Sequence, residues 1–450
     1  MKAKDTLELT IDGYGMEGEG IAHADGFTFF VPYVMTGEQV KVAVDRVKGS
    51  VAFAHIIKMI SPSPLRREAG CPLFGKCGGC TLRHMPYDLQ IEVKKANVLS
   101  LFKKNAGMEL ADVPVFSAAQ DGYRNKIALP FGVEKGRHVL GMYKRGTHKV
   151  LPIEECPLHG DWIEPLISVV TSFVREKNIS VYDEGTGKGL LRHLVARRLP
   201  YRGGYRYGVI FVVNGTKLPS ERDLAMRLAK IWEGETSVYL CANTAHNNVI
   251  LTPEIRTLLG EDAIFAELAG GEWEVSPLSF LQVNFPVAEQ IYRDVVDSVR
   301  ETDVIVDAYS GTGIMSALLA AKAKKVIGIE VILPATENAG RNAARFGVGE
   351  KVTHLCGTVE DVLPQVVSEI GSYTLVVDPP RAGLDASVVE TILRHPPERI
   401  IYVSCSPATL TRDIARLGAA YSVDSVRLYD MFPGTPHIET LVSLRRRFDN

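Results

Sequence analysis

Five short apolar runs alternate with helical or loop segments from Val304 onward, and this alternation restricts the fold more than any other feature of the chain. Each run is long enough for a strand that is buried on both faces and too short for a helix. Strands that alternate with helices predict a parallel, doubly wound sheet of the α/β class. In chain order the runs are VIVDAYSG, KVIGIEV, KVTHLCG, YTLVVDPP and RIIYVSC.

The first of these runs ends in DAYSGTGIMS, which places Gly311 and Gly313 at a turn from a strand into a helix. At such a turn the backbone can approach a ligand closely, although Ser316 stands where the dinucleotide fingerprint has Gly or Ala. Glu330 ends the second run, where an acidic residue can bind both hydroxyls of a ribose. These features favour a nucleoside site and suit NAD and S-adenosylmethionine equally, and a tight turn without a ligand is the alternative.

Further polar side chains are expected at the same carboxyl edge of the sheet. Asp378 ends the fourth run, where two prolines stiffen the following loop, and Cys405 ends the fifth run just before a helix. The segment PHIETL then puts His437 and Glu439 at the start of a final strand, where a carboxylate can act as a general base. The alternatives are an aspartate that caps its strand and a cysteine that is a small buried apolar residue.

The rest of the chain divides into two regions. Residues 1–60 alternate apolar and polar side chains between Gly-rich breaks, which predicts a small antiparallel barrel, and the proline-containing SPSPLRRE is a linker. A helical stretch, YDLQIEVKKANVLSLFKKNAGM, is expected to end at Gly107, and the mixed runs after it predict an α+β region. We therefore expect three domains, at 1–60, 61–275 and 276–450.

The stretch CPLFGKCGGC holds three of the chain's seven cysteines within ten residues. These three are Cys71, Cys77 and Cys80. Cys156 is the best fourth partner, because Cys241 and Cys356 lie in apolar runs that predict core positions. Clustered thiols in a reducing compartment indicate a metal site, and the spacing alone favours zinc and an iron-sulfur cluster equally.

The composition limits where the protein works and what it binds. The 51 Lys and Arg residues nearly balance 53 Asp and Glu residues, so any surface for RNA has to be local. Candidate basic runs are KGRHVLGMYKRGTHK, LLRHLVARRLPYRGGYRYG and the three arginines 445–447, each of which is otherwise a solvated face. The N-terminus lacks the pattern of a signal peptide and no apolar run is long enough to span a membrane, so we expect a cytoplasmic protein. We also expect it to be a monomer.

Six motifs that follow one another along the chain resemble those of the RNA 5-methyluridine methyltransferases, class I enzymes that depend on S-adenosylmethionine. The motifs are SFLQVN, DAYSGTG, GIE, DPPRAGLD, YVSCSPATLTRD and PHIETL, and the segments YRNK and LLRHL are similar as well. The resemblance covers nearly the whole chain and implies a Rossmann-like C-terminal domain. It also implies that residues 1–60 are a TRAM module, an OB-like barrel that binds RNA. The stretch VILPATENA after Glu330 and TLRH after Cys80 depart from the family pattern.

The same resemblance implies roles for individual residues. Those expected to contact S-adenosylmethionine are Gln282, Tyr309, Glu330 and Asp378. Cys405 is expected to add to C6 of a uridine so that C5 can take the methyl group, and Glu439 to remove the C5 proton afterwards. The cysteine pattern is similar to that of family members with one 4Fe-4S cluster, which implies ligation by Cys71, Cys77, Cys80 and Cys156.

The barrel and the cysteine pattern together resemble the family branch that acts on 23S ribosomal RNA. The alternative substrate is the T-loop uridine of tRNA, with the same chemistry. A non-catalytic iron-sulfur protein that binds RNA is a further alternative. A radical S-adenosylmethionine enzyme would need a Cys-x3-Cys-x2-Cys loop, whereas the first two cysteines of this stretch are separated by five residues.

Overall fold

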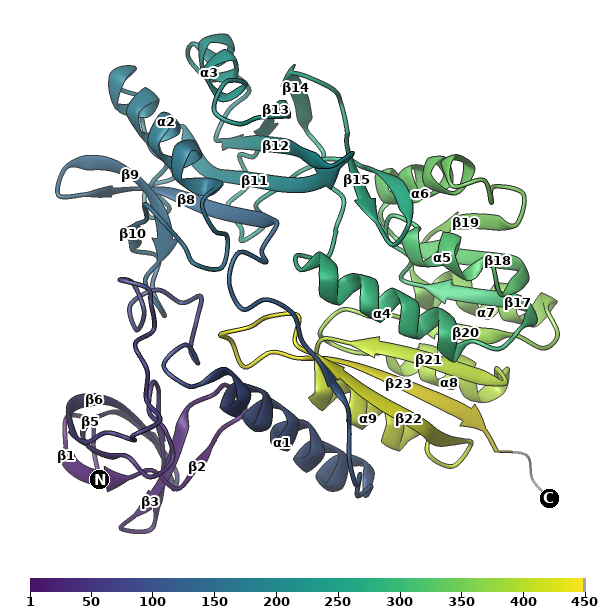
Figure 1. The fold of residues 1–450 in the computed structure, drawn as a ribbon, viewed down its shortest axis with the longest axis horizontal. Coiled ribbons are helices and arrows are strands. Elements are labelled where there is room, and N and C mark those ends of the chain that lie inside the picture. The colour runs from purple at the N-terminus through teal and green to yellow at the C-terminus, as the bar shows by residue number, and fades with distance from the viewer. Residues whose placement is uncertain (448–450) are drawn as a thin grey trace.

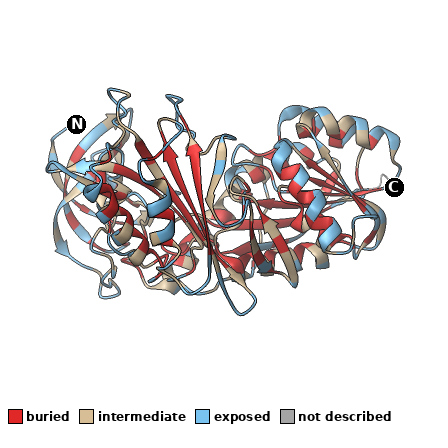
Figure 2. Ribbon diagram, turned by 90° about the horizontal axis from the view of Figure 1, so that it is seen from above, coloured by how far each residue is buried: buried red, intermediate tan, exposed pale blue. Residues whose placement is uncertain are grey.

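The computed structural model describes residues 1–447, so positions 448–450 of the expected C-terminal domain lie outside the described range. The N-terminal sheet and the middle region occupy the left of Figure 1, and the C-terminal region occupies the right. Figure 2 shows that the central strands of the larger sheets are buried while the outward faces of the helices are exposed. None of the helices in the described range is long and apolar enough to cross a membrane.

The N-terminal region is a six-stranded sheet that curls around its own apolar core. Its strands are β1 (Thr6–Thr10), β2 (Gly13–Tyr14), β3 (Gly20–Ala24), β4 (Phe27–Val31), β5 (Gln39–Lys48) and β6 (Val51–Ser61). Alternate residues of β5, such as Val40, Val42 and Val44, are buried, as the period-two pattern predicts. The strand order is β1-β5-β6-β4-β3-β2, and the β4/β6 pair is parallel because β4 is separated from β6 in the chain by β5. The prediction of a purely antiparallel barrel is wrong for this pair.

The middle region is built on a seven-stranded sheet of order β10-β9-β8-β11-β12-β13-β14. The strands are β8 (Lys126–Glu134), β9 (Arg137–Tyr143), β10 (Val150–Pro152), β11 (Leu191–Tyr201), β12 (Gly204–Val213), β13 (Glu235–Ala242) and β14 (Ile255–Leu259). Two helices, α2 (Ile163–Glu176) and α3 (Glu221–Leu228), share one apolar core with this sheet. The hairpin of β15 (Ile264–Leu268) and β16 (Gly271–Val275) follows, and Trp273 of β16 packs in a core with Leu199 of β11 and Ile314.

The C-terminal region is the predicted doubly wound sheet, of order β19-β18-β17-β20-β21-β23-β22-β7. Its strands are β17 (Thr302–Ala308), β18 (Ala323–Glu330), β19 (Val352–Cys356), β20 (Thr374–Val377), β21 (Arg399–Ser404), β22 (Tyr421–Tyr429) and β23 (Glu439–Arg446). Its helices are α4 (Phe285–Ser298), α5 (Ile314–Leu319), α6 (Leu333–Arg345), α7 (Val359–Glu369), α8 (Ala386–Arg394) and α9 (Pro407–Leu417). The chain leaves β17 toward β18 and later returns to its other side at β20, and this reversal of strand order is where ligands bind in open α/β sheets.

Two elements from the expected central domain belong to the C-terminal one. Helix α1 (Tyr87–Ala106) packs against α9 and places Phe102 in the core of the C-terminal sheet, and it ends at Gly107 as predicted. The short strand β7 (Val115–Phe116) pairs with β22 at the edge of that sheet. The sequence boundary at 275/276 therefore does not separate the two regions in space, because the apolar face of α1 finds its partner beyond that boundary.

A buried ion pair anchors α1 to the C-terminal region. Lys94 Nζ donates to Asp430 Oδ1 over 2.6 Å, and the two side chains are 1% and 0% exposed. Tyr87 donates its hydroxyl to the other carboxylate oxygen of Asp430 over 2.7 Å. Burial lowers the pKa of Lys94, and the charge of Asp430 opposes that shift.

We expect Lys94→Met to lower the free energy of unfolding by about 3–5 kcal/mol, because it leaves the Asp430 carboxylate buried without a cation. Urea denaturation measures this change. Lys95→Met is the matched control, since Lys95 pairs over the same 2.6 Å with Asp112, which is 88% exposed, and water screens such a pair so that its loss changes stability little. Equal losses for the two variants would contradict the importance assigned to the buried pair.

Candidate active site

The turn between β17 and α5 has the backbone that the glycine motif predicts. Tyr309, Gly311 and Gly313 have φ values of 69°, 55° and 77°. A Cβ on Gly313 would lie 2.7 Å from the Cβ of Ala339 on α6, so only glycine fits there. Ser316, which departs from the dinucleotide fingerprint, donates its hydroxyl to the buried carboxyl of Asp307 over 2.5 Å. Burial raises the pKa of Asp307 to about 7, and the hydrogen bond from Ser316 opposes this shift.

Glu330 ends β18, and its two carboxylate oxygens accept hydrogen bonds from backbone N–H groups after β17 and after β18. Gly311 N–H donates to Oε2 over 2.9 Å, and Ile332 N–H donates to Oε1 over 2.8 Å. The carboxylate is therefore held in one orientation beside the glycine turn, with lone pairs left over for a ligand.

A pocket opens at the carboxyl edge of the sheet, between β17, β20 and the loop before α4. Three of the four residues expected to contact the cofactor line it, namely Gln282, Tyr309 and Asp378. Glu330 is not part of its lining and reaches the pocket through the Gly311 turn. The hydroxyl of Ser310 in this lining is buried and has no hydrogen-bond partner among residues 1–447. An unpartnered buried hydroxyl and a preoriented carboxylate fit a polar ligand with a ribose.

The loop that carries Gln282 is held by the middle region. Asn125, in the YRNK segment, donates its side-chain amide to the carbonyl of Gln282 over 2.9 Å and its backbone N–H to the carbonyl of Val283 over 3.0 Å. Arg197 of β11 donates to the carbonyl of Ser279 in the same loop. The adjacent Phe280 is 68% exposed and lies in the lining of the pocket. An aromatic ring that is open to solvent beside a pocket has a free face for stacking.

Cys405 and Glu439 lie next to each other across two neighbouring strands. Ser404, the last residue of β21, pairs with Thr440 in the antiparallel strand β23. Cys405, which follows Ser404, therefore lies beside Glu439, which precedes Thr440. Glu439 is 4% exposed, and burial together with the charge of Asp378 raises its pKa to about 8, while Arg381 opposes the shift. Burial, Glu439 and Asp378 together raise the pKa of Cys405 to about 11. The resting site therefore holds a neutral thiol beside a carboxyl group that is poised near neutral pH.

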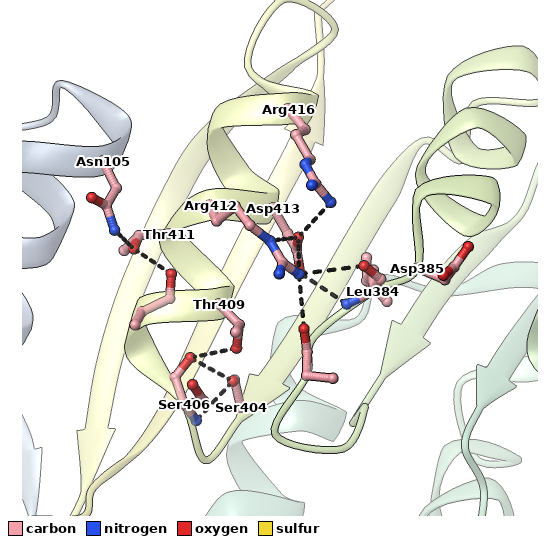
Figure 3. A network of polar contacts seen from close by, with 12 residues as sticks. Asn105, Leu384, Asp385, Ser404, Ser406, Thr409, Thr411, Arg412, Asp413 and Arg416 are labelled. Carbon is pink, nitrogen blue, oxygen red and sulfur yellow. Dashed lines mark hydrogen bonds and ion pairs between the residues drawn. The ribbon is translucent and has the colours of Figure 1, made fainter.

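Helix α9 ties together the two loops that present Asp378 and Cys405 (Figure 3). Asp413 accepts the N–H of Leu384 over 2.8 Å and the hydroxyl of Tyr402 over 2.9 Å, and its neighbour Arg412 donates to the carbonyl of Ala382 over 2.9 Å. Thr409 donates to the carbonyl of Arg381 over 3.2 Å. The positions of the two loops are therefore coupled through one helix.

The loop between β22 and β23 precedes Glu439, and it is the yellow loop that extends toward the N-terminal half in Figure 1. Residues outside the C-terminal region form hydrogen bonds with it. Gly434 accepts backbone hydrogen bonds from Thr81 and Leu82, over 2.9 and 3.0 Å, and donates its own N–H to Gln90 over 3.0 Å. Tyr123 donates its hydroxyl to the carbonyl of Pro433 over 3.2 Å. The approach of the chain to Glu439 is thus set by the cysteine segment and by α1.

The four expected metal-binding cysteines converge on one pocket that is separate from the one beside β17. Three come from the segment 71–80 and the fourth from the turn after β10, and all four line this pocket: Cys71, Cys77, Cys80 and Cys156. Burial raises the thiol pKa of Cys80 to about 12, and the charge of Cys156 adds to this rise. Within residues 1–447, no three His, Cys, Asp or Glu side chains are arranged to hold a single metal ion.

The two remaining cysteines differ in their surroundings. Cys241 is buried in β13, as the sequence predicts. Cys356 is exposed, so its predicted core position is wrong. It is the last residue of the edge strand β19, where no further strand covers it.

Sequence reasoning assigned no role to several residues that the structure places at the site. Arg381 and Phe280 were visible only as members of quoted motifs. Asp413 and Thr409 lie four residues apart in α9, a spacing that puts both on one helix face and so carried a signal. The hold of Asn125 on the Gln282 loop had no such signal, because the two segments are 157 residues apart.

Parts of the chain match models of known protein families. Residues 365–447 match the family model described as tRNA (Uracil-5-)-methyltransferase, and residues 4–57 match that of the TRAM domain. Residues 302–390 match a model described as RNA cap guanine-N2 methyltransferase.

Relatives extend the likeness over the full chain. A protein of Clostridium tetani described as an uncharacterized RNA methyltransferase is 34% identical over 98% of this chain and 96% of its own length. One of Halalkalibacterium halodurans with the same description is also 34% identical, over 98% and 97%. The crystal structure of Pyrococcus abyssi tRNA (uracil-54, C5)-methyltransferase in complex with S-adenosyl-L-homocysteine has a TM-score of 0.78 and 28% identity. The match covers 97% of this chain and 100% of that one.

Proposed function

The chain belongs to the RNA uracil-5-methyltransferases, and on this premise we propose that it methylates C5 of a uridine in 23S ribosomal RNA in the cytoplasm. Enzymes of this family take the methyl group from S-adenosylmethionine. In the proposed reaction Cys405 is the nucleophile and Glu439 is the base. The observation that carries the chemistry is the position of a thiol beside a buried carboxyl group, next to the pocket at the carboxyl edge.

The reaction needs this pair because C5 of a neutral uracil ring is a poor nucleophile. After the thiol of Cys405 has lost its proton to water, the thiolate forms a bond to C6, and the electron pair of the C5–C6 double bond makes C5 an enolate carbon. S-Adenosylmethionine, when bound, would supply an electrophilic methyl group from its positively charged sulfonium, and breaking the S–CH3 bond would leave S-adenosyl-L-homocysteine. After C5 has taken the methyl group, Glu439 accepts the C5 proton, the bond between Cys405 and C6 breaks, and the double bond returns.

The other residues of the pocket are proposed to bind and orient the two substrates. Glu330 is held by two backbone N–H groups in an orientation that suits the ribose hydroxyls, and Gln282, Tyr309 and Asp378 line the adjoining space. The uridine has to leave its stack to reach Cys405, which costs a few kcal/mol and favours an unpaired base. The exposed ring of Phe280 offers that base a stacking surface beside the pocket.

The rate at which methylated RNA is released from the enzyme is expected to rise with pH. Glu439 acts as a base only when it is ionised, and its pKa is raised to about 8, so below this value the active fraction grows about tenfold for each pH unit. The raised pKa of Cys405 acts in the same direction, since the thiolate is the nucleophile. Single-turnover release of free RNA that carries 5-methyluridine, between pH 6 and 9, measures the profile, with binding of S-adenosyl-L-homocysteine over the same range as the control. A rate that falls as the pH rises would contradict the assignment.

We propose further that one 4Fe-4S cluster is held by Cys71, Cys77, Cys80 and Cys156. The fit rests on the convergence of these four thiols on one pocket and on the backbone N–H of Gly79, which donates to the sulfur of Cys77 over 3.3 Å. Such N–H···S hydrogen bonds stabilise cluster thiolates. Bonds between the cluster iron and the four thiolates would join the segment after the barrel to the turn after β10. No step of methyl transfer uses the cluster.

Cys156→Ser is expected to lose most of the bound iron and acid-labile sulfide, which the wild-type protein should contain in equal amounts when purified without oxygen. The reason is that this residue supplies the only ligand from outside the segment 71–80. Iron and sulfide assays of the purified variant measure the loss. Cys356→Ser is the matched control, because Cys356 is exposed at a sheet edge and should retain both. Zinc in place of iron and sulfide in the wild type would contradict the cluster.

The choice of 23S ribosomal RNA is supported by the combination of a TRAM barrel with four converging cysteines, which resembles the family branch that acts on this RNA. The second candidate is tRNA, and it is favoured by the likeness to a structure titled tRNA (uracil-54, C5)-methyltransferase. Both substrates require the same chemistry at Cys405 and Glu439.

Methyl transfer from labelled S-adenosylmethionine to unmodified 23S ribosomal RNA and to unmodified tRNA, side by side, distinguishes the candidates. Label recovered as 5-methyluridine in the 23S RNA alone is the expected result. Label in tRNA alone would overturn the substrate and keep the chemistry. Label in neither would favour a non-catalytic protein that binds RNA.

A further inference from the structure

A second polar pocket lies in the middle region, and it shares no lining residue with the pocket at the carboxyl edge or with the cysteine pocket. It has a volume of about 310 Å³, which is within the ~300–1,000 Å³ range of small-ligand sites. Its lining comes from β8, from the end of β9 and the turn into β10, from the segment 181–185 and from the start of β11. Two of the basic runs noted in the sequence and the LLRHL motif therefore meet there, and methyl transfer uses none of them.

One carboxylate orients two aromatic side chains on one wall of this pocket. Glu184 accepts the hydroxyl of Tyr143 over 3.2 Å and pairs with Nδ1 of His148. The rings of Tyr143 and His148 lie 5.5 Å apart between centroids. Because Glu184 already binds these two partners, a ligand at this wall would contact the aromatic rings rather than a free carboxylate.

A second group of lining residues, around Tyr182 and Arg192, is equally ordered. The guanidinium of Arg192 lies 4.6 Å from the ring centroid of Tyr182 and donates to the carbonyls of Asn243 and Ala245, over 2.8 Å each. Tyr182 also pairs through its hydroxyl with Nδ1 of His246 over 3.2 Å. An aromatic ring that is held in this way loses little freedom when a ligand stacks on it.

The pocket also has hydrogen-bonding capacity that the protein does not use. Nδ1 of His193 is buried and has no partner among residues 1–447, while Nε2 lies 3.4 Å from the hydroxyl of Tyr143. Burial lowers the pKa of His193 to about 4, so the ring is neutral and, with Nε2 beside the Tyr143 hydroxyl, Nδ1 is the nitrogen that has no protein partner in the described range. Aromatic faces combined with a neutral polar group are the surroundings in which proteins bind unstacked nucleobases.

The rim of the pocket carries cations that lead toward the barrel. Lys144, Arg145 and Lys149 are exposed in the β9–β10 turn, and the guanidinium of Arg145 lies 5.4 Å from the ring centroid of Tyr33 in the barrel region. The backbone N–H of Arg145 donates to the carbonyl of Lys76 over 3.0 Å, which fixes this turn against the cysteine segment. A backbone of phosphates can follow such a rim while a base enters the pocket.

We propose that this pocket binds an unpaired nucleotide of the substrate RNA, away from the methylated uridine, with the base between Tyr143 and Tyr182 and the neighbouring phosphates on Lys144, Arg145 and Lys149. The inference rests on the proposed function, because it takes the partner to be the RNA that the enzyme methylates. It assigns to the LLRHL motif a contribution to RNA affinity and none to the chemical step.

The test is the affinity of Tyr182→Ala for the unmodified RNA that the wild type methylates, measured by fluorescence anisotropy. Loss of a stacked base is expected to raise Kd about tenfold or more. The KM for RNA should rise with it, and kcat at saturating RNA and the affinity for S-adenosyl-L-homocysteine should not change. Tyr182→Phe keeps the ring and is expected to bind RNA nearly as well as the wild type.

His148→Ala is the second variant, and His395→Ala is its matched control. His148 is exposed at the pocket, whereas His395 follows α8 at the opposite edge of the C-terminal sheet from the cofactor pocket. We expect weaker RNA binding only for His148→Ala. RNA affinities of Tyr182→Ala and His148→Ala within twofold of the wild type would overturn the proposal.

A measurement on the unaltered enzyme covers the case in which Tyr182→Ala does not fold. Photo-crosslinking to RNA that contains 4-thiouridine is expected to label peptides from residues 143–149 or 181–193. Crosslinks confined to other segments would overturn the proposal. If the wild type methylates no RNA yet binds it through these peptides, the proposed function fails while the pocket assignment holds.

Discussion

Glu439→Gln is expected to stop the reaction after the methyl group has reached C5, so that the enzyme remains covalently joined to its RNA. The amide keeps the shape of the side chain in its buried position but does not accept the C5 proton. Without that step the bond between Cys405 and C6 does not break. We expect turnover to fall by about 10²–10⁴-fold, which is the usual contribution of a general base, while a complex that survives denaturing gel electrophoresis accumulates.

The label in that complex separates this mechanism from simpler explanations. Methyl label from S-adenosylmethionine should travel with the protein band in Glu439→Gln and with free RNA in the wild type. An inactive Glu439→Gln protein that binds both substrates and forms no covalent complex would show that Glu439 acts before the methyl group is transferred. Glu330→Gln would instead weaken cofactor binding, because Glu330 holds the turn at Gly311.

Cys405→Ala is expected to abolish methyl transfer, with a loss of at least about a thousandfold, because no other group at the site can add to C6. The variant should still bind S-adenosyl-L-homocysteine and RNA, since Cys405 is not one of the residues that line the cofactor pocket. It should also fail to form the covalent complex when combined with Glu439→Gln. Labelled methyl transfer under single-turnover conditions measures the loss.

Cys356→Ala is the matched control for this variant. Cys356 is an exposed cysteine at the end of another strand of the same sheet, and its replacement should leave the rate unchanged. Methyl transfer by Cys405→Ala at the wild-type rate would remove the proposed nucleophile and with it the scheme.

The architecture of the C-terminal region follows from local patterns in the sequence. In a parallel sheet every strand is buried on both faces, so each one is a continuous apolar run, and its carboxyl end is marked by the first polar residue after it. Asp378 and Cys405 directly follow β20 and β21, and this is why their position at one edge of the sheet could be predicted. The sequence pattern shows where a strand ends but does not show whether that strand lies at the edge of the sheet. For this reason the prediction that Cys356 lies in the core is wrong.

Contacts between distant segments were beyond such patterns. The placement of α1 on the C-terminal sheet depends on a match of shape between apolar faces, and many helices of this composition would fit a given face. The pair of Lys94 with Asp430 is likewise invisible in a sequence where 23% of residues are charged. The hold of Thr81 and Leu82 on Gly434 involves only backbone groups, which every sequence has.

These unpredicted contacts explain how the N-terminal half takes part in the site. The loop before Glu439 is bounded by the cysteine segment, by α1 and by the residues around Tyr123, and the loop with Gln282 is held by Asn125. The base and a residue of the cofactor pocket are therefore positioned by elements outside the sheet that carries Cys405. A C-terminal fragment without these elements would lack the contacts that orient both loops.

The most direct test of the proposed mechanism is to identify the residue that becomes attached to RNA. RNA with 5-fluorouridine at the target position has no C5 proton for Glu439 to remove, so the adduct formed after methyl transfer should persist. Protease digestion and mass spectrometry are expected to find this adduct on the peptide that contains Cys405. An adduct on a different residue, or full methylation of uridine by the same preparation with no adduct to fluorouridine, would contradict the mechanism.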